Sequence, residues 1–227
     1  MYTLSEAKKK YESYIETNKG NVGMTLSQYC ETFMNVKYED LYAFISLDVE
    51  SDGLWGKPFA ISAVCYNVNG KELEAHTWSL RNLDTVVKNE WVRENVLPVL
   101  DFRPYQNVVR HFDDSYEHMM KNFAEFWLQH KDENAIWHMG HIVEANLFKE
   151  LHNMNYIGDF DAPYCPIEVS GFLKYLRYPA DSVDSFANYW GIKVEGSTHD
   201  PLYDARIAAK VFFYICEERD GRGHYNS

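Results

Sequence analysis

Three runs of β-forming residues follow one another early in the chain, and they limit the folds open to it. Residues 41–48 are largely apolar and end in Asp48, which is typical of a buried strand with a polar end. Residues 59–68 are a second such run, and the Asn-Gly pair that follows is a strong signal for a two-residue hairpin turn. Residues 71–80 alternate well enough to return as a third strand. The sequence therefore predicts three successive antiparallel strands.

After these strands the chain changes to alternating helical and extended segments. Apolar spacing predicts helices over residues 86–97, 115–130, 143–153, 169–176, 183–190 and 201–216, and short strands over residues 135–138 and 164–168. A meander followed by alternating helices and strands indicates an α/β fold, in which a mixed β-sheet is covered by helices on both faces.

The residues before the first strand favour helix. Residues 4–18 and 25–35 have the apolar spacing of two amphipathic helices. A length of 227 residues fits one large domain better than two. We predict an N-terminal helical extension over residues 1–40, one α/β domain over residues 41–218 and a polar tail over residues 219–227.

The net charge limits the kinds of molecule that this protein can bind. Lysine and arginine number 22 against 34 aspartates and glutamates, which gives a net charge of −12. A protein that grips long duplex nucleic acid by counterion release normally has the opposite sign. Acidic residues that bind divalent cations are compatible with a nucleic-acid enzyme, because the cations invert the local field. The charge therefore argues against tight non-specific duplex binding and leaves a metal-dependent enzyme open.

The sequence predicts a cytoplasmic protein without membrane contact. No apolar run approaches the roughly 20 residues needed to span a bilayer, and the first ten residues lack the apolar stretch of a secretory signal. The four cysteines are far apart, without the paired spacing of a metal site or a dense disulfide pattern, and we interpret them as reduced thiols; they are Cys30, Cys65, Cys165 and Cys216.

The first group of residues that could take part in chemistry is the pair Asp48 and Glu50. Side chains two apart on a strand share a face, so both carboxylates can converge on one hard cation such as Mg²⁺ or Mn²⁺. Taken alone, the pair could equally be two solvated acids where a strand meets a loop.

The second group is His199 and Asp204. Pro201 suits a first helical position, which places Asp204 in the first turn of a helix and His199 in the loop before it. The carboxylate could bind metal, and the imidazole could accept a proton from water near neutral pH. The alternative is an acid that satisfies the helix dipole beside an ordinary loop histidine.

These two groups lie in longer motifs that resemble a known family. The run Asp-Val-Glu-Ser-Asp-Gly-Leu at 48–54, with a strand after it, resembles the first motif of the DEDDh 3′–5′ exonucleases, which include RNase T and oligoribonuclease. His199-x-x-x-x-Asp204-Ala resembles their last motif. Residues 90–98, Glu-Trp-Val-Arg-Glu-Asn-Val-Leu-Pro, resemble a stretch of the small single-domain exoribonucleases of mycobacteria and phages. The resemblance spans about residues 41–216 and implies a ribonuclease H-like fold.

The third acid of the family motif falls on a different residue type here. The family usually has an aspartate just inside a helix in the middle of the chain, whereas this sequence has Glu144, followed by the apolar pair Leu147 and Phe148. Glutamate is also an oxygen ligand, but its carboxylate is one methylene further from the backbone. The alternative is a solvent-exposed acid in the first turn of a helix.

The resemblance implies a two-metal hydrolysis of phosphodiesters with Mg²⁺ or Mn²⁺. Asp48, Glu50 and Asp204 would hold one cation, Asp48 and Glu144 would help to hold the second, and His199 would be the general base. Ser51 and Leu54 would contact the substrate, with Leu54 as an apolar wedge beside the terminal bases. The expected substrate is single-stranded nucleic acid, RNA favoured and DNA open, cut to nucleoside 5′-monophosphates.

Other classes of function stay open at this level. Glu144 would also fit a catalytically weakened module that binds nucleic-acid ends or nucleotides without cutting them. The N-terminal helices could dock a partner that recruits the domain, and a second copy of the chain is a candidate partner. A phosphodiesterase for very short oligonucleotides is a related enzymatic alternative.

Overall fold

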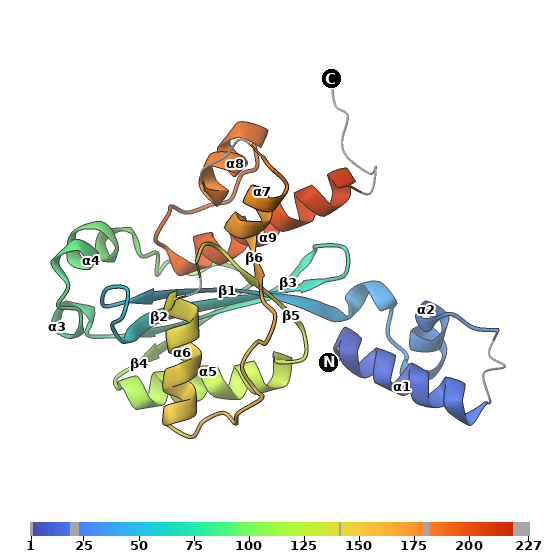
Figure 1. Ribbon diagram of the computed structural model, residues 1–227. Helices are drawn as coiled ribbons and strands as arrows, with labels where there is room; N and C mark the ends of the chain where they lie inside the picture. Colours follow the sequence, from blue (N-terminus) through green and yellow to red (C-terminus); the bar gives the residue numbers. More distant parts are fainter. Residues whose placement is uncertain (1, 19–22, 141, 179–181, 220–227) are drawn as a thin grey trace.

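The fold is built on a six-stranded mixed β-sheet with the strand order β4-β3-β2-β1-β5-β6 (Figure 1). The structure is a computed structural model that describes residues 2–18, 23–140, 142–178 and 182–219. The strands are β1 (Tyr42–Ser51), β2 (Pro58–Asn67), β3 (Glu72–Leu80), β4 (Val108–Asp113), β5 (Asn134–Trp137) and β6 (Ile167–Glu168). β1, β2 and β3 pair antiparallel, as the sequence predicts, and the other three strands add in parallel.

Helices cover both faces of this sheet. The α-helices of the described residues are α1 (Leu4–Thr17), α2 (Leu26–Tyr29), α3 (Leu83–Val86), α4 (Glu90–Asn95), α5 (Tyr116–His130), α6 (Ile142–Asn153), α7 (Val169–Tyr175), α8 (Val183–Trp190) and α9 (Pro201–Arg219). Figure 1 shows α5 and α6 on one face of the sheet and α7, α8 and α9 on the other. The predicted α/β architecture with helices on both faces is confirmed.

The two sides of β1 have different roles. Its odd-numbered residues Ile45, Leu47 and Val49 belong to the apolar cluster formed with α5 and α6. From Phe44 onwards its even-numbered residues face α9, since Phe44 packs against the cluster of α9 and the hydroxyl of Ser46 donates to the carbonyl of Ala205 at 2.7 Å. Because side chains alternate along a strand, the acids that follow Ser46 at every second position are also directed towards α9.

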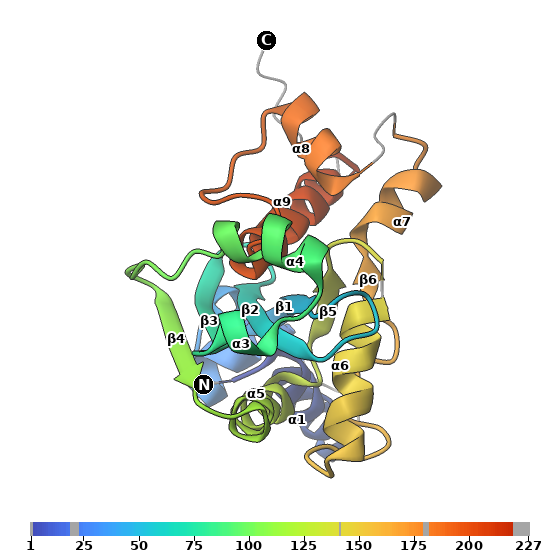
Figure 2. The same cartoon turned by 90° about the vertical axis from the view of Figure 1, so that its left-hand side faces the viewer.

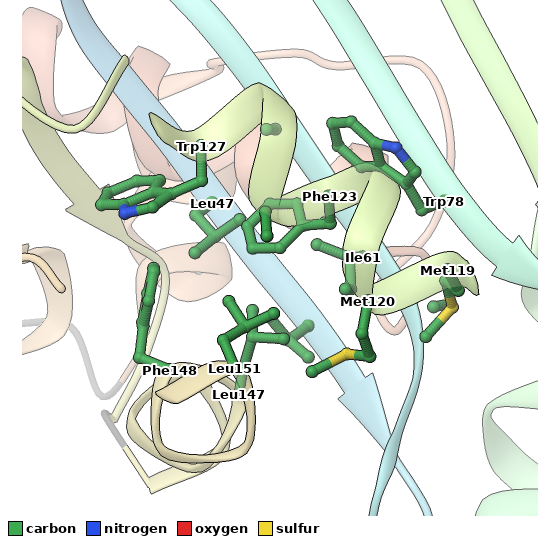
Figure 3. Packing of buried hydrophobic residues seen from close by; sticks show 14 of the residues in the cluster. Leu47, Ile61, Trp78, Met119, Met120, Phe123, Trp127, Leu147, Phe148 and Leu151 are labelled. Atoms are coloured by element: carbon green, nitrogen blue, oxygen red, sulfur yellow. The ribbon is translucent and has the colours of Figure 1, made fainter. Parts of the chain in front are cut away.

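The larger core lies between the sheet and the α5–α6 layer (Figure 3). Trp78 of β3 lies edge-on to Phe123 of α5, and Trp127 of α5 lies edge-on to Phe148 of α6. Phe123 and Trp127 are fully buried. This packing fixes the sheet against two helices, and a second apolar cluster, which includes Phe186 and Leu202, packs on the opposite face.

The hairpin between β2 and β3 needs glycine at its turn. Gly70 has a φ of 75°, and a Cβ atom there would lie 2.7 Å from the ring of Phe213 on α9. The side-chain oxygen of Asn67 accepts from the amides of Asn69 and Lys71 and closes the turn. The predicted hairpin is confirmed, but its turn is longer than the two residues predicted, because the amide of Asn67 donates to the carbonyl of Lys71 and leaves residues 68–70 in the loop. The glycine also lets α9 approach the sheet closely.

The helix predicted over residues 86–97 is interrupted. α3 ends at Val86, the amides of Lys88 and Asn89 donate to Oδ1 of Asp52, and the side chain of Asn89 then caps α4. If residues 86–97 formed a single helix, the carboxylate of Asp52 would lose the hydrogen bonds from these two amides. A 3₁₀ turn, Leu97–Val99, follows.

Other differences from the predicted elements are smaller. The sequence analysis did not predict β4, a half-exposed strand whose residues Val-Val-Arg-His-Phe-Asp do not alternate. The second N-terminal helix is split into α2 and a π-helical turn, Cys30–Met34, which ends at Asn35 with a φ of 52°. α9 extends to Arg219, and residues 220–227 of the predicted polar tail lie outside the described residues.

The N-terminal helices have a small apolar cluster of their own. Ala7 of α1, Cys30 and Leu41 are fully buried in it. A backbone bridge between Thr3 and Tyr42 joins this segment to the start of β1. Among the residues that the structure describes, no helix is both long and apolar enough to cross a membrane.

The packing in Figure 3 leads to a stability prediction. We expect Phe123→Ala to lower the free energy of unfolding by about 3–5 kcal/mol, because it removes a fully buried ring and leaves a cavity. Urea unfolding followed by circular dichroism measures the change. Phe160→Ala is the matched control, because Phe160 is 95% exposed and its loss should change stability by less than about 0.5 kcal/mol. Equal effects of the two substitutions would contradict this packing.

Candidate active site

Asp48, Glu50 and His138 lie where β1 and β5 run side by side. β5 pairs with β1 in parallel, with Trp137 opposite Leu47, so the next residues, His138 and Asp48, are also neighbours. Asp48 and His138 are both buried. Glu50 follows Asp48 by two positions and therefore shares its face of the sheet.

Asp204 reaches the same place from the first turn of α9. Asp200 holds this turn, because its Oδ1 accepts from the amide of Leu202 and its Oδ2 accepts from the amide of Asp101, each at 3.0 Å. Its carbonyl accepts from the amide of Asp204. The predicted start of the helix at Pro201 is confirmed, and the capping acid is Asp200.

His199 has a backbone conformation that directs it towards the acids. Its φ is 70°, in the left-handed region, and its amide donates to Oδ2 of Asp204 at 2.9 Å. Its Nδ1 lies 3.9 Å from Oε1 of Glu50, and its ring meets the ring of Trp91 edge-on at a centroid distance of 5.4 Å. The side chain is 42% exposed, so water can reach it.

Two groups of potential ligands share Asp204. In one, ligand atoms of Asp48, His138 and Asp204 all lie within 4.8 Å of one another, and in the other this holds for Glu50, His199 and Asp204. Both groups line a cavity of about 580 Å³. Figure 2 looks onto this end of the molecule, with α4 in front, α9 above it and α6 to the lower right.

Glu144 lines the same cavity from the first turn of α6. Its side chain is buried, with the residue 4% exposed, so the solvent-exposed acid considered above is excluded. It belongs to neither of the two tight groups. The structure thus brings all four predicted acids and His199 into one cavity, with Glu144 further from the others.

The predicted substrate contacts also lie at this cavity. Leu54 is 54% exposed on its lining, where an apolar side chain is available to a ligand. Ser51 lines the cavity too, but it is buried and its hydroxyl donates to the carbonyl of Gly53 at 2.8 Å. The hydroxyl of Ser51 therefore has a local role in the turn after β1.

Burial and mutual repulsion shift the titration of these acids. Burial, followed by the charge of Asp204, raises the pKa of Asp48 and of Glu50 well above the ordinary range of carboxyl groups. Burial also raises the pKa of Glu144 and of Asp204 to about 7. Four ionised carboxylates in one buried cavity repel one another, and a divalent cation would relieve this repulsion.

His138, which also lines the cavity, was not among the predicted site residues. Its Nε2 lies 3.5 Å from Oδ2 of Asp184 on α8 and 3.8 Å from Oδ1 of Asp204. Asp184 accepts a hydrogen bond from the hydroxyl of Tyr203 at 3.1 Å. The available signal was the position of His138 directly after a short strand, but its proximity to Asp48 depends on which strand β5 pairs with.

Solved structures with the same fold include exonucleases. Pop2p of S. pombe, in a form with Mg²⁺ and Mn²⁺ bound, is 17% identical over 98% of this chain and 93% of that chain, with a TM-score of 0.51. A 3′-exonuclease that recognises the 3′ end of a histone mRNA stem-loop is 10% identical over 79% of this chain and 83% of that chain, with a TM-score of 0.55.

Exonuclease I from Methylocaldum szegediense is 12% identical with a TM-score of 0.56, over 79% of this chain and 41% of that chain. No protein-family profile and no curated protein matches the sequence. At these identities the likeness establishes the fold, and the predicted ribonuclease H-like fold is confirmed.

The shifted pKa values predict how stability depends on pH in the presence of a chelator. Asp204 keeps its proton up to about pH 7 in the folded protein but loses it near pH 4 when unfolded. The unfolded state therefore binds fewer protons between pH 4 and 7, and stability falls as the pH rises through this range. Asp204→Asn should reduce this loss of the free energy of unfolding by about 2–4 kcal/mol.

Urea unfolding of both proteins at pH 5 and pH 8 measures this difference. Asp114→Asn is the control, because its carboxylate is on the surface beside Arg81. If the wild-type protein loses no more stability than Asp204→Asn between pH 5 and pH 8, the acids do not repel one another in the fold.

Proposed function

We propose that this protein is a metal-dependent 3′–5′ exonuclease that hydrolyses single-stranded nucleic acid, RNA in preference to DNA, to nucleoside 5′-monophosphates. The observation that supports this most is that three buried acids, Asp48, Glu144 and Asp204, line one cavity together with the half-buried Glu50 and His199. These residues come from distant parts of the chain. Bringing four acids together costs free energy, and a bound cation would offset their charge.

The residues fit a divalent cation of the Mg²⁺ or Mn²⁺ type. Carboxylate oxygens dominate the donor set, and Oδ1 of Asp204 is buried without a hydrogen-bond partner among the described residues. Asp48, Glu50 and Asp204 would hold one ion, and Asp48 and Glu144 would help to hold a second. Such ions supply Lewis-acid stabilisation of the charge on the phosphoryl group. Pop2p, which shares the fold, binds both metals.

His199 is suited to accept the proton of the attacking water. Its Nδ1 lies 3.9 Å from Glu50, a separation that one water molecule can bridge. The hydrogen bond from its amide to Asp204 and the edge contact with Trp91 hold the ring at the open side of the cavity. In this position His199 moves a proton and does not need to bind the cation.

The surroundings of the cavity favour a short, single-stranded substrate. Leu54, Trp91 and Met139 line it with exposed apolar surface, which suits stacking of terminal bases. The net charge of −12 disfavours a long duplex. The preference for RNA rests on the resemblance of residues 90–98, and the 3′-exonuclease with the same fold recognises the 3′ end of a histone mRNA stem-loop.

The proposal assigns activity to residues 41–218, with residues 1–40 as an extension and residues 219–227 as a tail. It places the protein in the cytoplasm, with RNA 3′ ends as its main partner and a homodimer as a further candidate. If the cavity only bound nucleotides, as the position of Glu144 outside the tight ligand groups would allow, the protein would retain RNA ends without shortening them.

The first activity prediction concerns the acids. Asp48→Asn should lower the rate of hydrolysis of a 3′-labelled single-stranded RNA in Mn²⁺ at least about 10²-fold, because it removes a ligand of both ions. Asp114→Asn, a change of the same chemistry on the surface, should leave the rate unchanged. Normal turnover by the Asp48 variant, or no turnover by the wild-type protein on any RNA or DNA strand, would refute the proposal.

The second activity prediction separates proton transfer from metal binding. His199→Ala should lower kcat by about 10²–10⁴-fold while the Kd for Mn²⁺, measured by isothermal titration, stays within a factor of about three. His152→Ala is the control, because His152 pairs with Asp159 on the surface. If Mn²⁺ affinity falls together with kcat, His199 is a ligand and the assigned roles are wrong.

A further inference from the structure

Two buried polar atoms in the cavity face each other without forming a hydrogen bond. They are Nε2 of His138 and Oδ1 of Asp204, 3.8 Å apart, and neither has a hydrogen-bond partner among the residues that the structure describes. His138 is 7% exposed and Asp204 is 3% exposed. Buried polar atoms are nearly always paired, so two unpaired ones at one point indicate a place where a ligand can bind.

The fold holds the imidazole in this position. Ser46 and Ile136 are paired on β1 and β5, and both face α9. Two residues further on, Asp48 and His138 face the same way, towards the first turn of α9. His138 therefore lies beside Asp48 because of the strand register, independently of any contact that its own side chain makes.

The distances suit a shared cation. Ligand atoms of Asp48, His138 and Asp204 lie within 4.8 Å of one another. Ligands bound to one ion at about 2.0–2.2 Å lie about 3–4 Å apart. A separation of 3.8 Å is too long for a hydrogen bond, but it is normal for two ligands of the same ion.

We propose that His138 is a nitrogen ligand of the cation held between Asp48 and Asp204, and that it makes this site prefer Mn²⁺ to Mg²⁺. Mg²⁺ selects oxygen ligands, whereas imidazole binds first-row transition ions well. This inference rests on the proposed function for the presence of a cation in the cavity. It adds to the four carboxylates a fifth ligand of a different chemical class.

Asp184 offers an alternative partner for the same nitrogen. Its Oδ2 lies 3.5 Å from Nε2 of His138, and its Oδ1 is occupied by the hydroxyl of Tyr203. If His138 only carried a positive charge between Asp184 and Asp204, it would position these acids without touching the ion. The two roles differ in whether the imidazole nitrogen is bonded to the metal.

Pulsed electron paramagnetic resonance of bound Mn²⁺ distinguishes these roles, because a directly bonded ¹⁴N atom modulates the electron spin echo. We expect the wild-type protein to show this modulation and protein labelled with ¹⁵N-histidine to show it shifted. His138→Gln should lose the modulation, whereas His199→Gln should keep it. We further expect His138→Gln to weaken Mn²⁺ binding at least about tenfold in isothermal titration and Mg²⁺ binding by less than about threefold.

Each outcome has a distinct meaning. Mn²⁺ binding without histidine modulation, or modulation that disappears in His199→Gln and not in His138→Gln, overturns the inference and leaves the proposed function intact. Failure of the wild-type protein to bind Mn²⁺ overturns the inference, and absence of RNA hydrolysis in both Mn²⁺ and Mg²⁺ overturns the proposed function as well. Circular dichroism shows whether His138→Gln folds. If it does not, the same question is answered by labelling the His199→Gln protein with ¹⁵N-histidine and measuring whether the modulation shifts. In that background, absence of the shift refutes the inference.

Discussion

The mutual repulsion of buried carboxylates is the constraint on which the structure of this cavity depends. Asp204 is at its centre, since it belongs to both tight ligand groups. Hydrogen bonds hold it in place. Asp200 caps the turn through the amide of Leu202 and joins it to the amide of Asp101, and the amide of His199 donates to the carboxylate of Asp204. His199 makes this hydrogen bond with a positive φ of 70°, a conformation that costs free energy for a residue other than glycine.

Packing on the opposite face of the sheet offsets the free energy that burying these acids costs. Burying acids with raised pKa values costs free energy, and this cost must be offset by packing elsewhere. The cluster between the sheet and the α5–α6 layer is suited to this role, with Phe123 and Trp127 fully buried in it. β1 connects the two layers directly, because Leu47 packs into the apolar cluster and the adjacent Asp48 faces the acids. A change in the packing of β1 would therefore move the ligands as well.

Local signals in the sequence were sufficient for most elements and for part of the site. β1, β2 and β3 follow from apolar runs and an Asn-Gly turn, and Asp48, Glu50, His199 and Asp204 lie in short motifs whose neighbours fix their geometry. β4 was missed because an edge strand need not alternate, and the predicted helix over residues 86–97 is divided because Asp52 takes two of its amides. His138 could not be assigned, because its place beside Asp48 arises from the pairing of Leu47 with Trp137, ninety residues apart in the chain. Such a pairing leaves no local pattern in the sequence.

The position of Glu144 links the binding of cations to the docking of both helical layers. α6 packs on the face of the sheet opposite to α9, and its first turn reaches the cavity from there. Asp204 and Glu144 can therefore meet only when both layers are in place on the sheet. Since the complete ligand set exists only in the folded state, any cation it binds stabilises that state, by about 2.7 kcal/mol when the free ion is at a hundred times its Kd. The same ion that the proposed chemistry requires would thus remove the repulsion that destabilises the fold.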